Sequence, residues 1–178
     1  MSSRIAFLIK ILAITLFLFG TYYLFFLRPK LELASNLLNS EKILARHHTN
    51  LLQNRLSYIE LTRLDPKRAN FNLEKSSLVG TLQKTNEEGL KNINEDKEIA
   101  KIDGKLTERF PALLAETKKI YEDQESLLEK VFATKSYAEG IVILKSEEAI
   151  NLLTRQTNLI LEYQFWLEKM EKLQGEEK

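Results

Sequence analysis

The chain has 178 residues, a formal net charge of +1 at pH 7 and no cysteine. Its first 30 residues hold four of the 26 basic side chains and no acidic one, so residues 31–178 carry 22 basic and 25 acidic side chains. These charges are interspersed, which argues against a nucleic-acid partner, and the missing cysteines exclude a disulfide framework. The length after the first 30 residues is enough for one domain with a hydrophobic core.

A long apolar segment, residues 5–27, lies near the amino end. As a helix it would be about 34 Å long, enough to cross a hydrocarbon core of about 30 Å. Its only charge is Lys10, whose butyl stem can reach the near interface. Tyr22 and Tyr23 would lie at the level of the far headgroups, and Arg28 would follow in water. The sequence therefore predicts a single transmembrane helix in contact with the lipid bilayer.

Two other interpretations of this segment are weaker. A cleavable signal peptide has an apolar region of about 7–15 residues followed by small residues. The segment is longer, and the nearest cleavage candidate, residues 32–34, has a glutamate where a small residue is needed. A buried helix of a soluble protein would need a large apolar core around it, whereas the rest of the chain is amphipathic. We therefore expect an uncleaved signal-anchor.

The flanking charges leave the orientation of this anchor nearly undecided, because basic residues on its two sides almost balance. A head of four residues before the apolar segment is typical of an anchor that leaves the N-terminus in the cytoplasm. We therefore expect the bulk of the chain to be exported. The absence of cysteine and of N-x-S/T sites is compatible with a bacterial envelope protein.

The remainder of the chain predicts an all-α fold, because turn signals are few and no stretch alternates apolar and polar residues. We expect a first helix over residues 31–64, continuous with the anchor across Pro29. A weaker helix should follow over residues 72–93, because Gly80 and Gly89 each cost about 1 kcal/mol relative to alanine. On the first helix a single apolar stripe steps by sevens, with Leu37, Leu44 and Leu51 beside Leu38, Ala45, Leu52 and Ile59.

Three further helices are expected. One runs from Pro111 to Phe132 with the proline in its first turn, where no hydrogen bond is lost. Ser136 to Glu139 reads as a capping box that opens a short helix, and Ser146 should cap the last one, over residues 147–173. That last helix carries Leu152, Leu159, Trp166 and Leu173 at steps of seven, between Leu153, Ile160 and Leu167 on one side and Ala149, Tyr163 and Met170 on the other.

Stripes this wide can face more than one neighbour, so we expect an antiparallel bundle of about four helices with coiled-coil character. A long simple coiled coil is the alternative. The layout is then an N-terminal tail (1–4), the transmembrane anchor (5–27), the helical domain (31–174) and a polar C-terminal tail (175–178).

The sequence predicts no catalytic, cofactor-binding or metal-binding residue. His47 and His48 are adjacent and would point about 100° apart on a helix, which suits a polar role better than one metal. Acidic clusters are matched by nearby lysines and lack the spacing of calcium loops. Phosphate loops, G-x-S-x-G elbows and H-E-x-x-H pairs are absent.

Partner binding is the function class that remains. We expect a non-catalytic scaffold or assembly subunit, bound to the bilayer, that contacts protein partners or self-associates through its helical stripes. Trp166 is expected to pack in the core. If its ladder instead faces outward, Leu159, Tyr163, Trp166 and Met170 are candidate partner contacts. The alternatives are a sensory or ligand-binding bundle that signals through a partner, and a membrane-tethered enzyme or cofactor protein.

Overall fold

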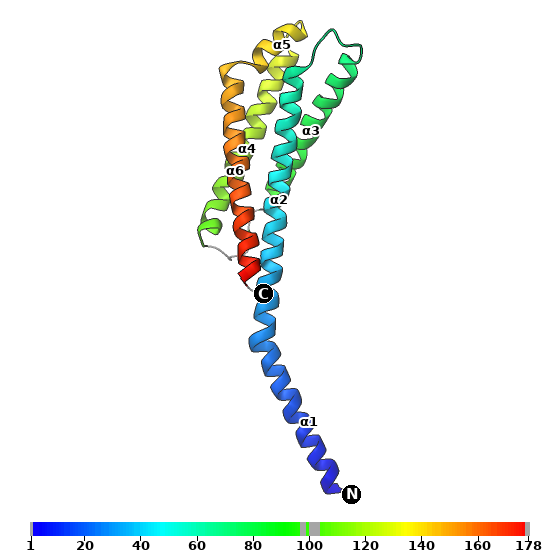
Figure 1. Cartoon of the computed structure of the whole chain (residues 1–178), viewed down its shortest axis with the longest axis vertical. Coiled ribbons are helices and arrows are strands. Elements are labelled where there is room, and N and C mark those ends of the chain that lie inside the picture. The colour runs from blue at the N-terminus through cyan, green and yellow to red at the C-terminus, as the bar shows by residue number, and fades with distance from the viewer. Residues whose placement is uncertain (1, 97–98, 100–103, 177–178) are drawn as a thin grey trace.

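The first part of the chain is one long helical rod. The computed structural model describes residues 2–96, 99 and 104–176, and these form helices and turns without a β-strand. Helix α1 (Ser2–Tyr22), a π-helical turn η1 (Tyr23–Leu27) and helix α2 (Arg28–Arg63) follow one another directly. Figure 1 shows α1 extending alone from a group of packed helices. The all-α fold and the continuity across Pro29 are confirmed.

The π-helical turn η1 lies where the rod passes a proline. Pro29 has no N–H, so the usual bond from residue 29 to the carbonyl of Phe25 cannot form. The N–H of Arg28 bonds the carbonyl of Tyr23, one residue further back than in an α-helix. This bond widens the turn. The wide turn accommodates the proline, and the helix continues instead of ending.

Four long helices lie side by side beyond the rod's exposed end. These are α2 and the helices α3 (Phe71–Glu95), α4 (Gly104–Phe132) and α6 (Glu147–Glu176). Helix α2 contacts α3 and α6, and helix α4 contacts the same two helices. The short helix α5 (Tyr137–Leu144) packs on α4 at the end remote from α1, and α6 runs back towards α1 (Figure 1). We call α2 from Leu37 onward, together with α3 to α6, the helical body.

The core of the helical body is formed by apolar residues that step by seven along the long helices. On α2 these are Leu37, Leu44, Leu51 and Tyr58, which are buried and which we call the inner ladder. Burying a large apolar side chain contributes about 1.5–3 kcal/mol. The largest fully buried side chains come from α2, α3, α4 and α6: Tyr58, Tyr121, Tyr163, Phe110, Leu44, Leu51, Leu61, Leu82, Leu106, Leu113, Ile120 and Leu127.

The single apolar stripe predicted on α2 divides into two in the structure. Beside the buried inner ladder, Leu38 and Leu52 are exposed, and Ala45 and Ile59 are half-buried. Neighbouring residues of a helix point about 100° apart. Because α2 has α3 and α6 on its inner side, both halves of the stripe cannot face the core. The prediction of one stripe is wrong, and the second half forms an outer ladder on the surface.

Helix α4 begins at Gly104, before the predicted start at Pro111. Leu106 and Phe110 are buried and hold the additional turns against the core. The exposed Pro111 therefore lies inside the helix, where its ring crowds the carbonyl four residues earlier, at a cost of about 3 kcal/mol. The prediction of a first-turn proline is wrong, because apolar burial before the proline outweighs this cost.

The serine caps at the remote end of the body are as predicted. The Ser136 hydroxyl accepts a hydrogen bond from the N–H of Glu139 at 3.3 Å and opens α5. The Ser146 hydroxyl accepts one from the N–H of Ala149 at 3.3 Å and opens α6. Each bond satisfies one of the free donors in a first helical turn. Both caps are local in sequence, which explains why the pattern identified them.

Candidate functional site

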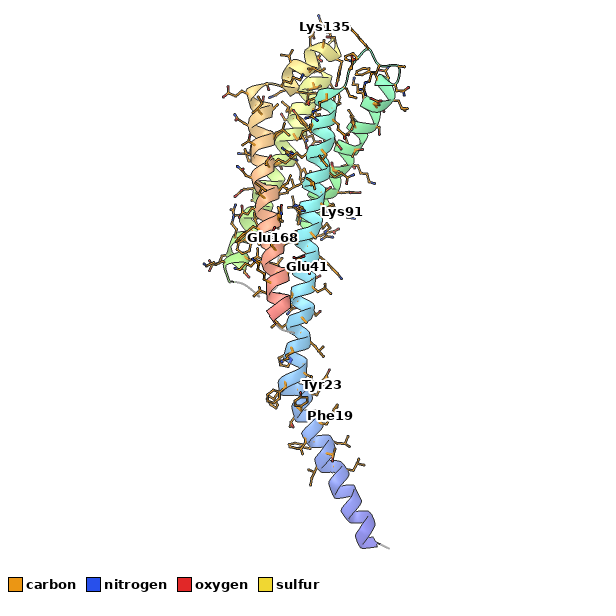
Figure 2. All side chains as sticks on the ribbon, in the orientation of Figure 1. Phe19, Tyr23, Glu41, Lys91, Lys135 and Glu168 are labelled. Atoms are coloured by element: carbon orange, nitrogen blue, oxygen red, sulfur yellow. The ribbon has the colours of Figure 1, made fainter. Side chains whose placement is uncertain are left out.

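The first candidate feature is the bare apolar surface of the rod. Between residues 12 and 27 no side chain is buried, and Leu12, Phe17 and Phe25 are 60%, 70% and 74% exposed. Figure 2 shows Phe19 and Tyr23 on the part of the rod that lies outside the helical body. An exposed apolar surface of this kind marks contact with a membrane or a partner. The helix is long and apolar enough to span a membrane; the side chain of Lys10 lies outside the described part.

Polar side chains along this segment form hydrogen bonds within the helix or lie at its end. The Thr21 hydroxyl donates to the carbonyls of Phe17 at 3.0 Å and Leu18 at 2.8 Å. An unpaired donor in hydrocarbon would cost several kcal/mol. Directly after the apolar segment, Arg28 and Glu32 form an exposed ion pair at 2.7 Å. The change from apolar to charged surface therefore occurs at the start of α2.

The second candidate feature is a group of buried amides and hydroxyls that crosses the core. Asn54 of α2 donates through Nδ2 to Thr85 Oγ1 at 2.9 Å and to Asn86 Oδ1 at 2.7 Å. Gln156 Nε2 of α6 donates to Asn54 Oδ1 at 2.9 Å. One side chain thus ties α2 to both of its neighbours. Because a buried polar group left unpaired costs about 1–3 kcal/mol, these bonds fix the relative heights of the three helices.

Asn50 extends the group to α4. Its Nδ2 donates to the Thr85 carbonyl at 2.8 Å and to the Tyr121 hydroxyl at 3.2 Å. The tyrosine ring fits because α3 has a glycine opposite it: a Cβ on Gly89 would lie 2.5 Å from Cζ of Tyr121 and 2.8 Å from Nδ2 of Asn50. The helix predicted over residues 72–93 is present as α3, and Gly89 lies where the Tyr121 ring of α4 meets it. We call this set the polar layer: Asn50, Asn54, Thr85, Asn86, Tyr121 and Gln156.

A buried histidine lies on the α1 side of the polar layer. His47 is fully buried, and its ring stacks on Tyr163 with centroids 5.9 Å apart. Its Nε2 lies 3.1 Å from Oδ2 of Asp96, although the two are not aligned as a hydrogen bond, and Arg46 pairs with the same carboxylate. Burial lowers the pKa of His47 below its ordinary value. The negative charge of Asp96 acts to raise this pKa, and the positive charge of Arg46 acts to lower it further. The imidazole is therefore neutral at pH 7.

His47 and His48 lie on different sides of α2. His48 is half-buried, whereas the adjacent His47 is fully buried, as expected for side chains about 100° apart on a helix. Among the described residues, no group of three or more His, Cys, Asp or Glu side chains could hold a metal ion. What the arrangement provides is a neutral base facing a carboxylate inside the core.

The structure places the four sequence-predicted partner contacts in the core. Leu159, Tyr163, Trp166 and Met170 are 4%, 0%, 7% and 1% exposed. The Tyr163 hydroxyl lies 3.1 Å from Oγ1 of Thr117 on α4. Their role as partner contacts stays a prediction, and it would require this core to open. The exposed large apolar residues on the long α2 and α6 helices beyond η1 are Leu31, Leu33, Leu38, Leu52 and Leu56 on α2 and Ile150, Leu161 and Phe165 on α6.

The polar layer was missed from the sequence, although a signal for it exists. Ser40, His47 and Asn54 step by seven and lie next to the inner ladder, and all three are buried. A polar residue at a core position of a heptad pattern interrupts the apolar stripe and commonly fixes helix register. Such interruptions identify buried polar positions, although they do not show which side chains pair.

Comparison with known proteins adds no identity to this geometry. No protein-family model, curated protein or solved structure matches the chain.

Proposed function

We propose that this protein is a single-pass, membrane-anchored scaffold or assembly subunit that acts through protein–protein contacts and catalyses no reaction. The observation that carries the proposal is the exposed apolar helix α1, which continues through η1 into α2 as one rod. Residues 28–36 of this rod are all exposed and form a stalk about 14 Å long. A partner bound to the body is thereby held at a defined height above the bilayer.

The helical body suits this role as an antiparallel bundle with coiled-coil character. The contacts of α2 with α3 and α6, and of α4 with the same two helices, support a closed ring of four. The ladders that step by seven support packing of the coiled-coil kind. The polar layer ties these helices at one height, which gives a rigid platform for partners.

We place the body on the exported side of the membrane, in a compartment such as the bacterial envelope. Arg4 and Lys10 on the N-terminal side nearly balance Arg28 and Lys30 on the other, so a labelling experiment has to decide the orientation. Because the chain has no cysteine, the S126C variant has a single exposed thiol. A membrane-impermeant maleimide should label it in intact cells. Labelling only after permeabilisation would place the body in the cytoplasm instead.

A sensory or ligand-binding bundle is the second candidate, favoured by the buried polar atoms of the core. Besides the polar layer, Ser40 Oγ and Gln124 Oε1 are buried without a hydrogen-bond partner in the described residues. Replacing buried polar groups by apolar ones is often neutral or stabilising, so their presence suits a core that changes register or opens. A signal would then pass through the rod to a partner.

The native mass of the full-length chain, extracted from its own membranes in mild detergent, tests the proposal. A scaffold or assembly subunit should run as a complex of fixed stoichiometry. A 20.7 kDa chain that is monomeric in its detergent micelle would contradict the proposal. If such a monomer also gains thermal stability with a small solute from the same cells, the sensory function takes its place.

A further inference from the structure

The outward face of α2 carries an apolar ladder that the other described helices leave exposed or half-buried. The outer ladder consists of Leu31, Leu38, Ala45, Leu52 and Ile59, which step by seven. Leu31, Leu38 and Leu52 are 60%, 48% and 37% exposed, and the adjacent Leu56 is 50% exposed. Leu52, Leu56 and Ile59 follow one another at the spacing of one helix face. This face runs along the rod directly from the end of the apolar segment.

We propose that the partner of this face is α2 of a second copy, and that the two helices form a parallel two-stranded coiled coil. The inference rests on the proposed function, because anchors in one membrane give both rods the same direction. A two-fold axis parallel to the rods then brings each outer-ladder residue against its own counterpart. A repeat of seven keeps such a seam continuous along two supercoiled helices.

The charges beside the ladder are complementary for this parallel register. With the outer ladder at the d positions, the flanking g residue of one helix faces the e residue five positions later on the other. This rule pairs Glu41 with Arg46 of the partner subunit, and Arg55 with Glu60 of the partner subunit. Symmetry forms each pair twice. The remaining g and e pairs along residues 27–53 contain no like charges.

The existing contacts of these arginines leave donors for the pairing. Arg46 already pairs with Asp96, and Arg55 donates through Nε to Thr157 Oγ1 at 3.0 Å. A guanidinium has five N–H donors, so each arginine can also bond a carboxylate across the seam. The a positions of this register are Arg28, Ser35, Lys42, Thr49 and Leu56, so the apolar contacts of the seam come from the outer ladder and Leu56. Polar residues at a positions specify the register at a cost in stability.

Disulfide cross-linking of the full-length chain in lipid vesicles tests the dimer. The chain has no cysteine, so L38C, L52C and L56C each carry one thiol at the seam. L161C is the matched control, because Leu161 is a leucine on α6 that is 57% exposed. Mild oxidation should give covalent dimers at the three α2 positions and at most a tenth as much at L161C. Equal yields at L161C, or none at Leu52 and Leu56, would overturn the proposal.

A charge exchange tests the register. E60R places like charges opposite Arg55 of the partner subunit and should lower cross-linking of L56C several-fold. R55E/E60R restores opposite charges and should restore most of the yield. If E60R has no effect, or the double variant stays low while its melting temperature is unchanged, the register is wrong.

Failure of the dimer can be told from failure of the proposed function by one further measurement on the same samples. A chain that stays in the membrane and runs in a larger complex, but does not cross-link through α2, would refute the dimer and leave the scaffold intact. A chain that leaves the bilayer on alkaline extraction would refute the scaffold itself.

Discussion

At Gly89, the lack of a side chain makes room for the Tyr121 ring of α4. From the sequence, Gly80 and Gly89 weaken α3 equally, because each costs about 1 kcal/mol in a helix interior. In the structure they differ. A Cβ at Gly80 would have no heavy atom within 4 Å, whereas one at Gly89 would overlap the Tyr121 ring and the Asn50 amide. The polar layer thus depends on one glycine and not on the other.

Replacing the two glycines should therefore have opposite effects. G89A should lower the free energy of unfolding by about 1–3 kcal/mol, because the buried Tyr121 ring must shift. G80A should raise it by about 1 kcal/mol through helix propensity alone. Chemical denaturation of both variants measures the difference. Equal effects of the two substitutions would contradict the tight contact of Gly89 with the Tyr121 ring.

His47 gives the fold a specific response to pH. Burial lowers the pKa of His47 below its ordinary value of 6.5, which the unfolded chain retains. Below pH 6.5 the unfolded chain therefore binds the proton first, and stability falls by up to about 1.4 kcal/mol per pH unit until the folded pKa is passed. H47F keeps a ring on Tyr163 and should flatten this fall between pH 7 and 5.

His48 is the matched control for this prediction. Burial also lowers the pKa of His48, but its side chain is only half-buried. H48Q should therefore keep most of the pH dependence. Denaturation midpoints for the three proteins at pH 7, 6 and 5 are the measurement. An H47F curve as steep as that of the original chain would assign the response to other groups.

Sequence patterns predicted the apolar residues of the core better than the polar ones. Trp166 and Leu159 lie on a ladder of seven, and both are buried as the favoured interpretation requires. Asparagine is a residue type usually found on the surface. The partners of Asn54, which are Asn86 and Gln156, are distant from it in sequence. Hydrophobic periodicity reports which side of a helix is buried. It does not report which amides meet across three helices.

Short sequence motifs predicted the start of a helix correctly where the interactions that decide it are local in sequence. The caps at Ser136 and Ser146 involve residues three positions apart, and both are present. The start of α4 depends instead on contacts of Leu106 and Phe110 with the core, which no short motif encodes. The local preference of Pro111 for a first turn therefore gave the wrong boundary.

The interior position of Pro111 leads to a prediction about α4. P111A restores the N–H that can bond the carbonyl four residues earlier, and it removes the ring that crowds this carbonyl. Because Pro111 is exposed, no packing is lost. Stability should rise by about 1–2 kcal/mol, less than the full helix penalty because proline also restricts the unfolded chain. A loss of stability in P111A would show that the proline is needed where it stands.

At the scale of the whole molecule, the rod joins an apolar segment to a body with its own core. The sequence predicted the apolar segment and the continuous helix, because length and composition alone carry that information. It did not separate the inner ladder from the outer ladder of α2, because that division depends on where α3 and α6 lie. The outward face therefore emerged only from the packing of the helices.

We propose that α1 and η1 remain in a bilayer and hold the body to it. Alkaline carbonate extraction of membranes that contain the full-length chain tests this claim most directly, with the mass of the recovered chain as the readout. An anchored chain should stay with the membrane pellet at its intact mass of 20.7 kDa. Recovery of the intact chain in the supernatant, or of a chain that begins after Leu27, would contradict it.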